Sequence, residues 1–375
     1  MRPDFDFFTI FVQGLSSIEV AVAVIGFVSA AAFAGLWATK LGRIILPQPQ
    51  ESRVADFLPF NKLMADGITI RCYNGSFARV FKVEGVDLSF VTDEKSLSMM
   101  EARKSWIDSM SDLQVVCRVI TLRERISMEA DSGDFGNQLL EQISMTWRNN
   151  LDRVYSNGHY IVLSVADRPE ALKDLNYASQ ALLATLNDYG VKPMFETEDS
   201  AAADSPLAIF SKICSPLSKP MPKVRGAEGY QLNELLTADH IHFTDEKGLI
   251  KFFSGDKEMF AIVMGIRSSG DYMDEGMIAS LLSIDCELTM LHNVKPIFKP
   301  HARALLMQQQ RMAAVTSFSP DVINQYSEAL SAIEDSDADY QALTEYAMDI
   351  IIKGETMEEI EFGESEVQRI CRLFS

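Results

Sequence analysis

The sequence is poor in cysteine and contains no closely spaced cysteine pair. Its five cysteines (Cys72, Cys117, Cys214, Cys286 and Cys371) lie far apart, and none forms a C-x-x-C pair. A zinc ribbon uses C-x-x-C pairs, and a disulfide scaffold is typical of short chains dense in cysteine. Neither class is therefore indicated, and reduced thiols in a cytoplasmic body fit the sequence best.

Basic side chains are also scarce. The 375 residues include 34 Lys and Arg against 53 Asp and Glu, a net charge of −19. Binding to a phosphate backbone requires a surplus of Lys and Arg, so we expect no direct contact with nucleic acid. Residues 331–375 alone carry 12 acidic and 3 basic residues. This acidic stretch is either a solvated helix face or a docking surface for a basic partner, because net charge bears on solubility and association.

Motifs for nucleotide and acyl chemistry are missing. The sequence has no G-x-x-x-x-G-K-[ST], no G-x-G-x-x-G after a strand and no G-x-S-x-G. The first cradles phosphates with backbone N–H groups and a lysine, and the last presents a nucleophilic serine. We therefore predict no catalytic residues and no ATP or other cofactor site in this chain.

Long apolar runs are limited to one near the N-terminus. Residues 20–39 carry no charge, Lys40 follows at once, and small residues recur at Gly26, Ala30 and Ala34. About 20 apolar residues span a bilayer core, and small residues four apart allow another helix to approach closely. We expect a transmembrane anchor from Val20 to Thr39, with the body of the chain on the cytoplasmic side. A buried or interfacial helix and a cleaved signal peptide are the alternatives.

The remaining sequence contains two similar halves. Each is expected to run as a hairpin, a helix, a strand, a long helical segment, a strand and a final helix. The first hairpin is marked by Asn74-Gly75, and the second half begins near Ile241. The boundaries we assign are 1–50 for the anchor and linker, 51–197 for the first unit, 198–230 for a second linker and 231–375 for the second unit. The expected class is α+β, with an N-terminal transmembrane helix followed by two similar sheet-plus-helix, ferredoxin-like units.

One histidine pair has metal-ligand spacing. His240 and His242 stand two apart on an expected strand and so share a face, with His292 and Cys286 as candidate third ligands. Two ligands do not make a zinc site, so ordinary strand histidines are the leading interpretation. A membrane-tethered enzyme that uses these residues is the alternative function.

Several short stretches resemble one family. In chain order these are Phe57-Leu-Pro-Phe60 with Asp66-Gly67-Ile68, Gly85-Val86-Asp87, Leu122-Arg-Glu-Arg125, Asn233-Glu-Leu-Leu236 with Ile241-His-Phe243, and Met277–Leu282 running into Glu287–His292. In their order and spacing, from about Val54 to Phe374, the sequence is similar to the N-terminal half of the large ATPase of type IV secretion and conjugation systems, the CagE/TrbE/VirB family.

The resemblance implies a scaffold rather than an enzyme. Members of the family continue into a P-loop ATPase domain, which these 375 residues do not contain, so ATP and magnesium are expected only with that domain. The sequence is thus a split or shortened member, or a part of a longer protein. The implied role is to dock an ATPase ring to inner-membrane components of the secretion channel, as a homo-oligomer at the bacterial inner membrane.

Overall fold

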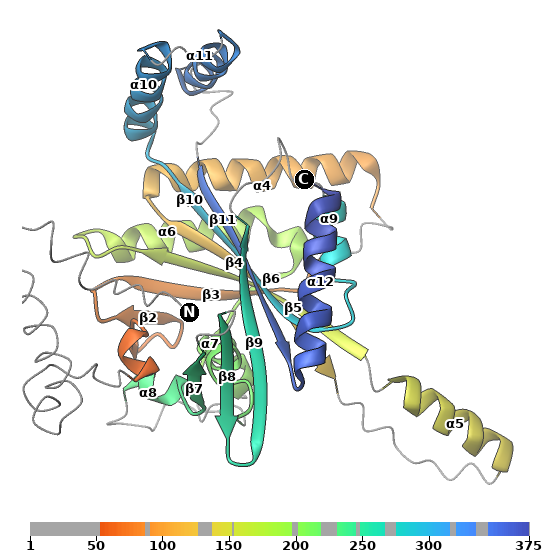
Figure 1. Cartoon of the computed structure of the whole chain (residues 1–375). Coiled ribbons are helices and arrows are strands. Elements are labelled where there is room, and N and C mark those ends of the chain that lie inside the picture. The colour runs from red at the N-terminus through yellow and green to blue at the C-terminus, as the bar shows by residue number, and fades with distance from the viewer. Residues whose placement is uncertain are drawn as a thin grey trace, which may run out of the picture. The chain divides into compact units, whose positions relative to one another are not determined.

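Strands from both halves of the chain form a single antiparallel sheet. The computed structural model describes residues 53–86, 91–126, 137–151, 154–196, 202–218, 231–244, 248–266, 275–315, 320–334 and 344–374. Within these residues the sheet has eleven strands in the order β1-β2-β3-β5-β4-β10-β11-β9-β8-β7, and β6 pairs with β3 beside this path (Figure 1). Residues 57–375 belong to one compact unit.

The first half and the connector after it contain both strands and short helices. The elements of the first half are η1 (Val54–Phe57), β1 (Phe60–Leu63), β2 (Thr69–Cys72), β3 (Phe77–Val83), α4 (Asp93–Leu113), β4 (Val116–Ile126), α5 (Gln138–Leu151), β5 (Val154–Val165), α6 (Ala171–Thr185), η3 (Asn187–Tyr189) and β6 (Val191–Pro193). The connector carries η4 (Ala202–Asp204), α7 (Ala208–Cys214) and α8 (Leu232–Leu236).

The second half repeats the order of the first. Its elements are β7 (His240–Phe243), β8 (Leu249–Ser254), β9 (Lys257–Ile266), α9 (Glu275–Leu281), β10 (Glu287–Pro296), α10 (Lys299–Val315), α11 (Pro320–Glu334), β11 (Thr344–Gly354) and α12 (Met357–Leu373). The strand order reads the same from either edge when each strand is matched to its counterpart, β1 to β7, β2 to β8, β3 to β9, β4 to β10 and β5 to β11.

The predicted fold class, a transmembrane helix followed by two similar ferredoxin-like units, is wrong, because both halves contribute strands to one sheet. The inner edges of the two halves pair with each other, since β4 and β10 are antiparallel with Ile120 opposite Leu291. Two separate sheets would leave β4 and β10 as edges with unpaired backbone N–H and C=O groups. Pairing them satisfies these groups and makes one continuous sheet.

The membrane part of the prediction is not supported either. None of the helices in the described residues is both long enough and apolar enough to span a bilayer. The predicted anchor, Val20 to Thr39, lies outside those residues.

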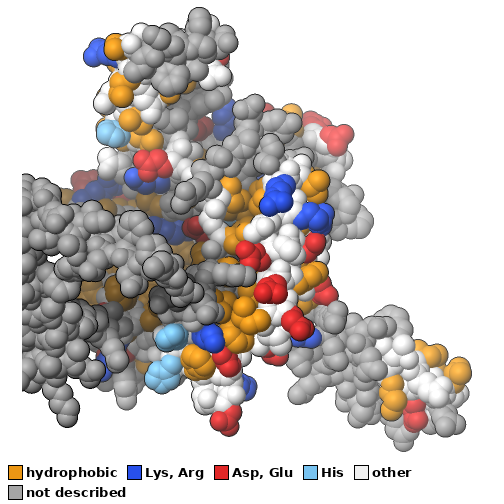
Figure 2. All heavy atoms as spheres, viewed as in Figure 1, with side chains coloured by type: hydrophobic (Ala, Val, Ile, Leu, Met, Phe, Trp, Pro, Cys, Tyr) orange, Lys and Arg blue, Asp and Glu red, His pale blue; other side chains and the backbone are white. Residues whose placement is uncertain are grey.

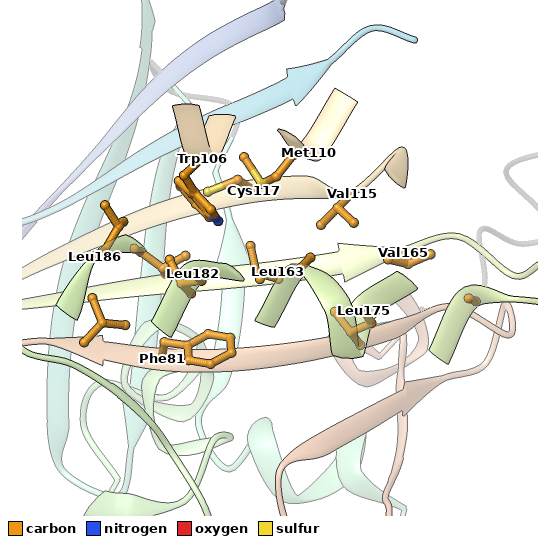
Figure 3. Close-up of a cluster of buried hydrophobic side chains, with 14 residues drawn as sticks. Phe81, Trp106, Met110, Val115, Cys117, Leu163, Val165, Leu175, Leu182 and Leu186 are labelled. Atoms are coloured by element: carbon orange, nitrogen blue, oxygen red, sulfur yellow. The ribbon is translucent and has the colours of Figure 1, made fainter. Parts of the chain in front are cut away.

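Helices of both halves cover the same face of the sheet. In the first half, α4 and α6 bury a core around Phe81, Trp106 and Leu163 (Figure 3). In the second half, α9 and α12 bury a core around Met290. Val294 packs against the first core, and it stands four residues from Met290 on β10. Side chains an even number apart on a strand share a face, so these helices form one layer.

The opposite face of the sheet is covered by the connector. Leu207, Ile209, Leu232 and Leu236, from α7, α8 and their flanks, pack with Ile120 of β4 and other strand residues in a second core. Ile120 lies an odd number of residues from Cys117, which belongs to the core under α4 and α6. The connector therefore lies on the other side of the sheet from the helix layer.

Both central hairpins carry helices at their tips. Ile126 of β4 pairs with Val154 of β5, so α5 lies in an insertion at the end of that hairpin. Pro296 of β10 pairs with Thr344 of β11, and α10 and α11 fill the equivalent insertion (Figure 1). Because β4 and β10 are antiparallel, the two insertions leave opposite ends of the sheet.

Candidate functional site

Helix α7 is held against the centre of the sheet by charged side chains from both halves. Lys353, near the end of β11, donates from Nζ to the backbone oxygen of Lys212 at 3.1 Å. Lys212 in turn pairs with Glu124 of β4, with 2.6 Å between Nζ and Oε2. Since Lys212 is in the last turn of α7, the Lys353 ammonium also meets the negative end of the helix dipole.

The Lys353 side chain is among the few buried charges of the described chain, with 8% of the residue exposed. Its partner across the strand pair is Glu287 of β10. Burial lowers the pKa of Lys353, and the nearby carboxylates of Glu287 and Glu124 oppose this. Burial raises the pKa of Glu287, and the backbone N–H of Arg125, 2.9 Å from Oε1, opposes it.

Because of these shifts, the contributions of Glu287 and Lys353 to stability change with pH in opposite directions. The folded pKa of Glu287 lies above its usual value, so its contribution to stability is fully present below that value and is lost as the pH rises through the folded pKa. The folded pKa of Lys353 lies below its usual value, so stability increases as the pH rises from the folded pKa towards 10.5. Both effects follow from burial of the charged form.

Arg123 also joins the two halves of the chain, close to Lys353 and Glu287. Arg123 of β4 donates from Nε to the carbonyl oxygen of Ile284, at 3.0 Å, and from Nη1 to Asn157 Oδ1, at 3.2 Å. Its guanidinium lies 4.5 Å from the centre of the Tyr155 ring. Arg123 thus fixes the turn before β10 of the second half to β4 and β5 of the first.

A cavity of about 500 Å³ lies between α7 and the strands that carry these charges. Its lining residues come from β4, β5, β9, β10, β11, η4, α7 and the segment after α7. They are Arg123, Glu124, Arg125, Ile126, Ser156, Ala203, Ala208, Ser211, Lys212, Ser215, Pro216, Ser218, Met259, Glu287, Thr289 and Lys353. The volume is within the range of small-molecule sites, and the lining combines basic, acidic and hydroxyl groups with apolar side chains.

Ser215 and Asp239 connect the segment after α7 to the segment after α8. Ser215 Oγ donates to the carbonyl oxygen of Leu236 and accepts from the backbone N–H of Ala238, both at 2.9 Å. Asp239 Oδ2 accepts from the backbone N–H of Leu217 at 2.8 Å. These bonds link the ends of α7 and α8 to the start of the second half and keep the cavity wall in place.

The predicted metal candidates are far apart in the sheet. His240 and His242 lie on the edge strand β7, and both are exposed. His292 lies on β10, where Nδ1 is 2.7 Å from the Tyr346 hydroxyl, and Cys286 is buried just before β10. Three strands separate β7 from β10, which places them about 19 Å apart. The described residues contain no group of three or more His, Cys, Asp or Glu able to hold a metal ion.

The five cysteines are all free thiols. Burial raises the pKa of Cys117 and of Cys286 to about 12, and that of Cys214 to about 11. The thiolate is the nucleophilic form, so these three side chains are poorly reactive at neutral pH.

Sequence reasoning missed the charges around the cavity. Glu124 and Arg125 appear above only within the stretch Leu122-Arg-Glu-Arg125, and Lys353 belongs to none of the motifs named there. The available signal was a charged residue closing the run Ile350–Ile352, because a lysine there must reach a partner or be exposed.

The region around the cavity is similar in sequence to a known protein family. No curated protein matches the sequence. Residues 202–372, slightly less than half of the chain, match the sequence model of the "CagE, TrbE, VirB family, component of type IV transporter system". The match runs from η4 through α7 to α12, so it includes Lys212, Glu287 and Lys353 and confirms the resemblance over these residues. Residues 202–372 are therefore similar to the CagE, TrbE, VirB family of type IV transporter components.

Proposed function

We propose that this chain is a docking module of a type IV secretion or conjugation apparatus, which joins an ATPase to inner-membrane components of the channel. ATP and magnesium would be bound by an ATPase domain or subunit outside these residues, and the module would act as a homo-oligomer in the assembled machine. The family match of residues 202–372 supports the assignment to a type IV apparatus. The surface of α12 supports the docking role.

Helix α12 presents acidic side chains on its outward face. Glu355, Glu358 and Glu361 are exposed at its start, and the aromatic side chain of Phe362, 48% exposed, lies beside them. Within the described residues none of these three glutamates forms an ion pair, whereas Glu366 pairs with Arg369 further along. Figure 2 shows acidic side chains over α12, with basic side chains towards one end of the helix.

This surface suits a basic partner. Three unpaired carboxylates within two helical turns attract Lys and Arg, and the exposed Phe362 ring adds apolar area for contact. The inner face of α12 is anchored by Ile360, Val367 and Ile370, all buried in the second-half core. The helix can therefore bind a partner as a rigid element without unfolding. We assign the surface to a Lys/Arg-rich segment of another component of the apparatus.

Reversing the charge of this surface tests the proposal. We expect Glu358→Lys with Glu361→Lys to lower the frequency of transfer at least about tenfold in a deletion strain complemented with the variant, because like charges then face the basic partner. The helix dipole opposes a lysine in the first turn, at a cost of about 0.3–1 kcal/mol, so thermal unfolding should show a folded variant.

A matched control separates local from global charge. Glu101→Lys with Asp112→Lys changes the net charge by the same amount on α4, where both side chains are exposed. Transfer with this variant should equal that of the wild type. Wild-type transfer with the α12 variant, or an equal loss with the α4 variant, would contradict a docking surface on α12.

A further inference from the structure

The cavity beside α7 contains hydrogen-bond donors that the fold itself does not use up. Lys353 Nζ carries three N–H donors and gives one to the backbone of Lys212. Thr289 is 1% exposed and Ser211 is 8% exposed, and both hydroxyl side chains line the same cavity. An ammonium and two hydroxyls, each more than nine-tenths buried, therefore surround one space.

The other charges of the lining are already engaged. Lys212 is paired with Glu124, and Arg123 donates to Ile284 and Asn157. Glu287 accepts from the backbone of Arg125, and burial favours the neutral form of this carboxyl group. Of the charged residues that line the cavity, four are cationic and two are acidic.

We propose that this cavity binds a small organic anion, whose carboxylate or phosphate group is held by Lys353 Nζ and the hydroxyls of Ser211 and Thr289. Hydrogen bonds to a charged acceptor are the strong ones, and three donors converging from β10, β11 and α7 suit the oxygens of either group. The rest of the molecule would lie against Met259, Ala208 and Pro216, in a volume typical of small ligands.

The site lies where the two halves and the connector meet. Lys353 and Thr289 come from neighbouring strands of the second half, and Ser211 comes from α7. Burial lowers the pKa of Lys353, so a bound anion would raise it again and make binding weaken as the pH rises. This inference does not depend on the docking role of α12, because the two sites share no residue.

Calorimetric titration of the full chain tests the proposal, with inorganic phosphate and succinate as separate probes. We expect one of the two to bind in the millimolar range, and the probe that binds identifies the group. Thr289→Val with Ser211→Ala should weaken binding at least about tenfold, because two charge-assisted hydrogen bonds are lost. Lys353→Met should abolish binding.

Matched surface variants serve as controls. Lys295→Met removes an exposed lysine of β10 that pairs with Glu345, and Ser365→Ala removes an exposed hydroxyl of α12. Both should bind the probe as the wild type does. If Lys353→Met does not fold, the Thr289 and Ser211 double variant still decides. Absence of binding by the wild type up to about 50 mM of either probe, or equal affinity in all variants, would overturn the proposal.

Discussion

Lys353→Met is expected to lower the free energy of unfolding by about 3–5 kcal/mol. The substitution preserves much of the side-chain volume but removes the ammonium of Lys353, which stands opposite Glu287 in the β10–β11 pair and whose charge lowers the pKa of that carboxyl group. It also removes the donor to the carbonyl oxygen of Lys212. The partly buried carboxylate of Glu287 loses a nearby positive charge and the carbonyl oxygen of Lys212 loses its donor, and together these losses make the effect large.

The loss in free energy of unfolding caused by Lys353→Met should depend on the charge of Glu287. In a Glu287→Gln background, Lys353→Met should cost at least about 1 kcal/mol less, since no carboxylate is left without a counter-ion. In the wild-type background the deficit should shrink as the pH falls towards the raised pKa of Glu287. Urea unfolding at several pH values measures both effects.

The control for this result is Lys295→Met, on the same sheet. Lys295 and Glu345 are about half exposed, so breaking their pair should change stability by less than about 1 kcal/mol. A Lys353→Met variant as stable as the wild type would show that the charges around the cavity do not hold α7 to the sheet.

Leu163→Ala is expected to weaken both halves of the sheet together. Leu163 is fully buried on β5, in the core shown in Figure 3, and truncation should cost about 2–5 kcal/mol. Because β5, β4, β10 and β11 are consecutive neighbours in the sheet, we expect amide hydrogen exchange to accelerate equally in β5 and in β11. Peptide-level exchange with mass spectrometry measures the two strands separately.

Two independent units would respond differently. In that case faster exchange would be confined to the first half, and protection around Ile350 of β11 would stay unchanged. Leu172→Ala serves as the control, because Leu172 on α6 is 37% exposed and its loss should change stability by less than about 0.5 kcal/mol. Confinement of the effect to β5 would contradict one cooperative sheet.

Local signals predicted several elements correctly. Asn74-Gly75 lies between β2 and β3, which pair as an antiparallel hairpin. Thr92 caps α4 by accepting from the backbone N–H of Lys95. Pro320 is the first residue of α11, where its missing N–H costs nothing. Each of these features depends on a few neighbouring residues, so the sequence alone contains the information.

One local signal was misleading. The pair Asn157-Gly158 is typical of a helix C-cap, yet both residues lie inside β5. The strand pairs with β4 along its whole length, from Val116 opposite Ser164 to Ile126 opposite Val154. The hydrogen bonds of this long ladder outweigh the turn preference of two residues.

Long-range features could not be predicted from periodicity. The alternation of apolar residues shows that β4 and β10 are strands, but it does not show that they pair with each other, because a partner distant in sequence leaves no local pattern. The cavity depends on the same pairing. Glu287 and Lys353 become neighbours only when β10 and β11 pair. Helix α7, which is distant from both in sequence, contacts Lys353 only when the connector packs on the sheet.

The most direct test of the docking role is purification of the type IV apparatus from cells that carry a tagged copy of this chain. We expect the chain to remain with the ATPase and the channel components at a constant ratio, whether or not ATP is present, and the Glu358→Lys, Glu361→Lys variant to be lost from them. Recovery of the chain alone, under conditions that keep the rest of the apparatus together, would contradict the proposal.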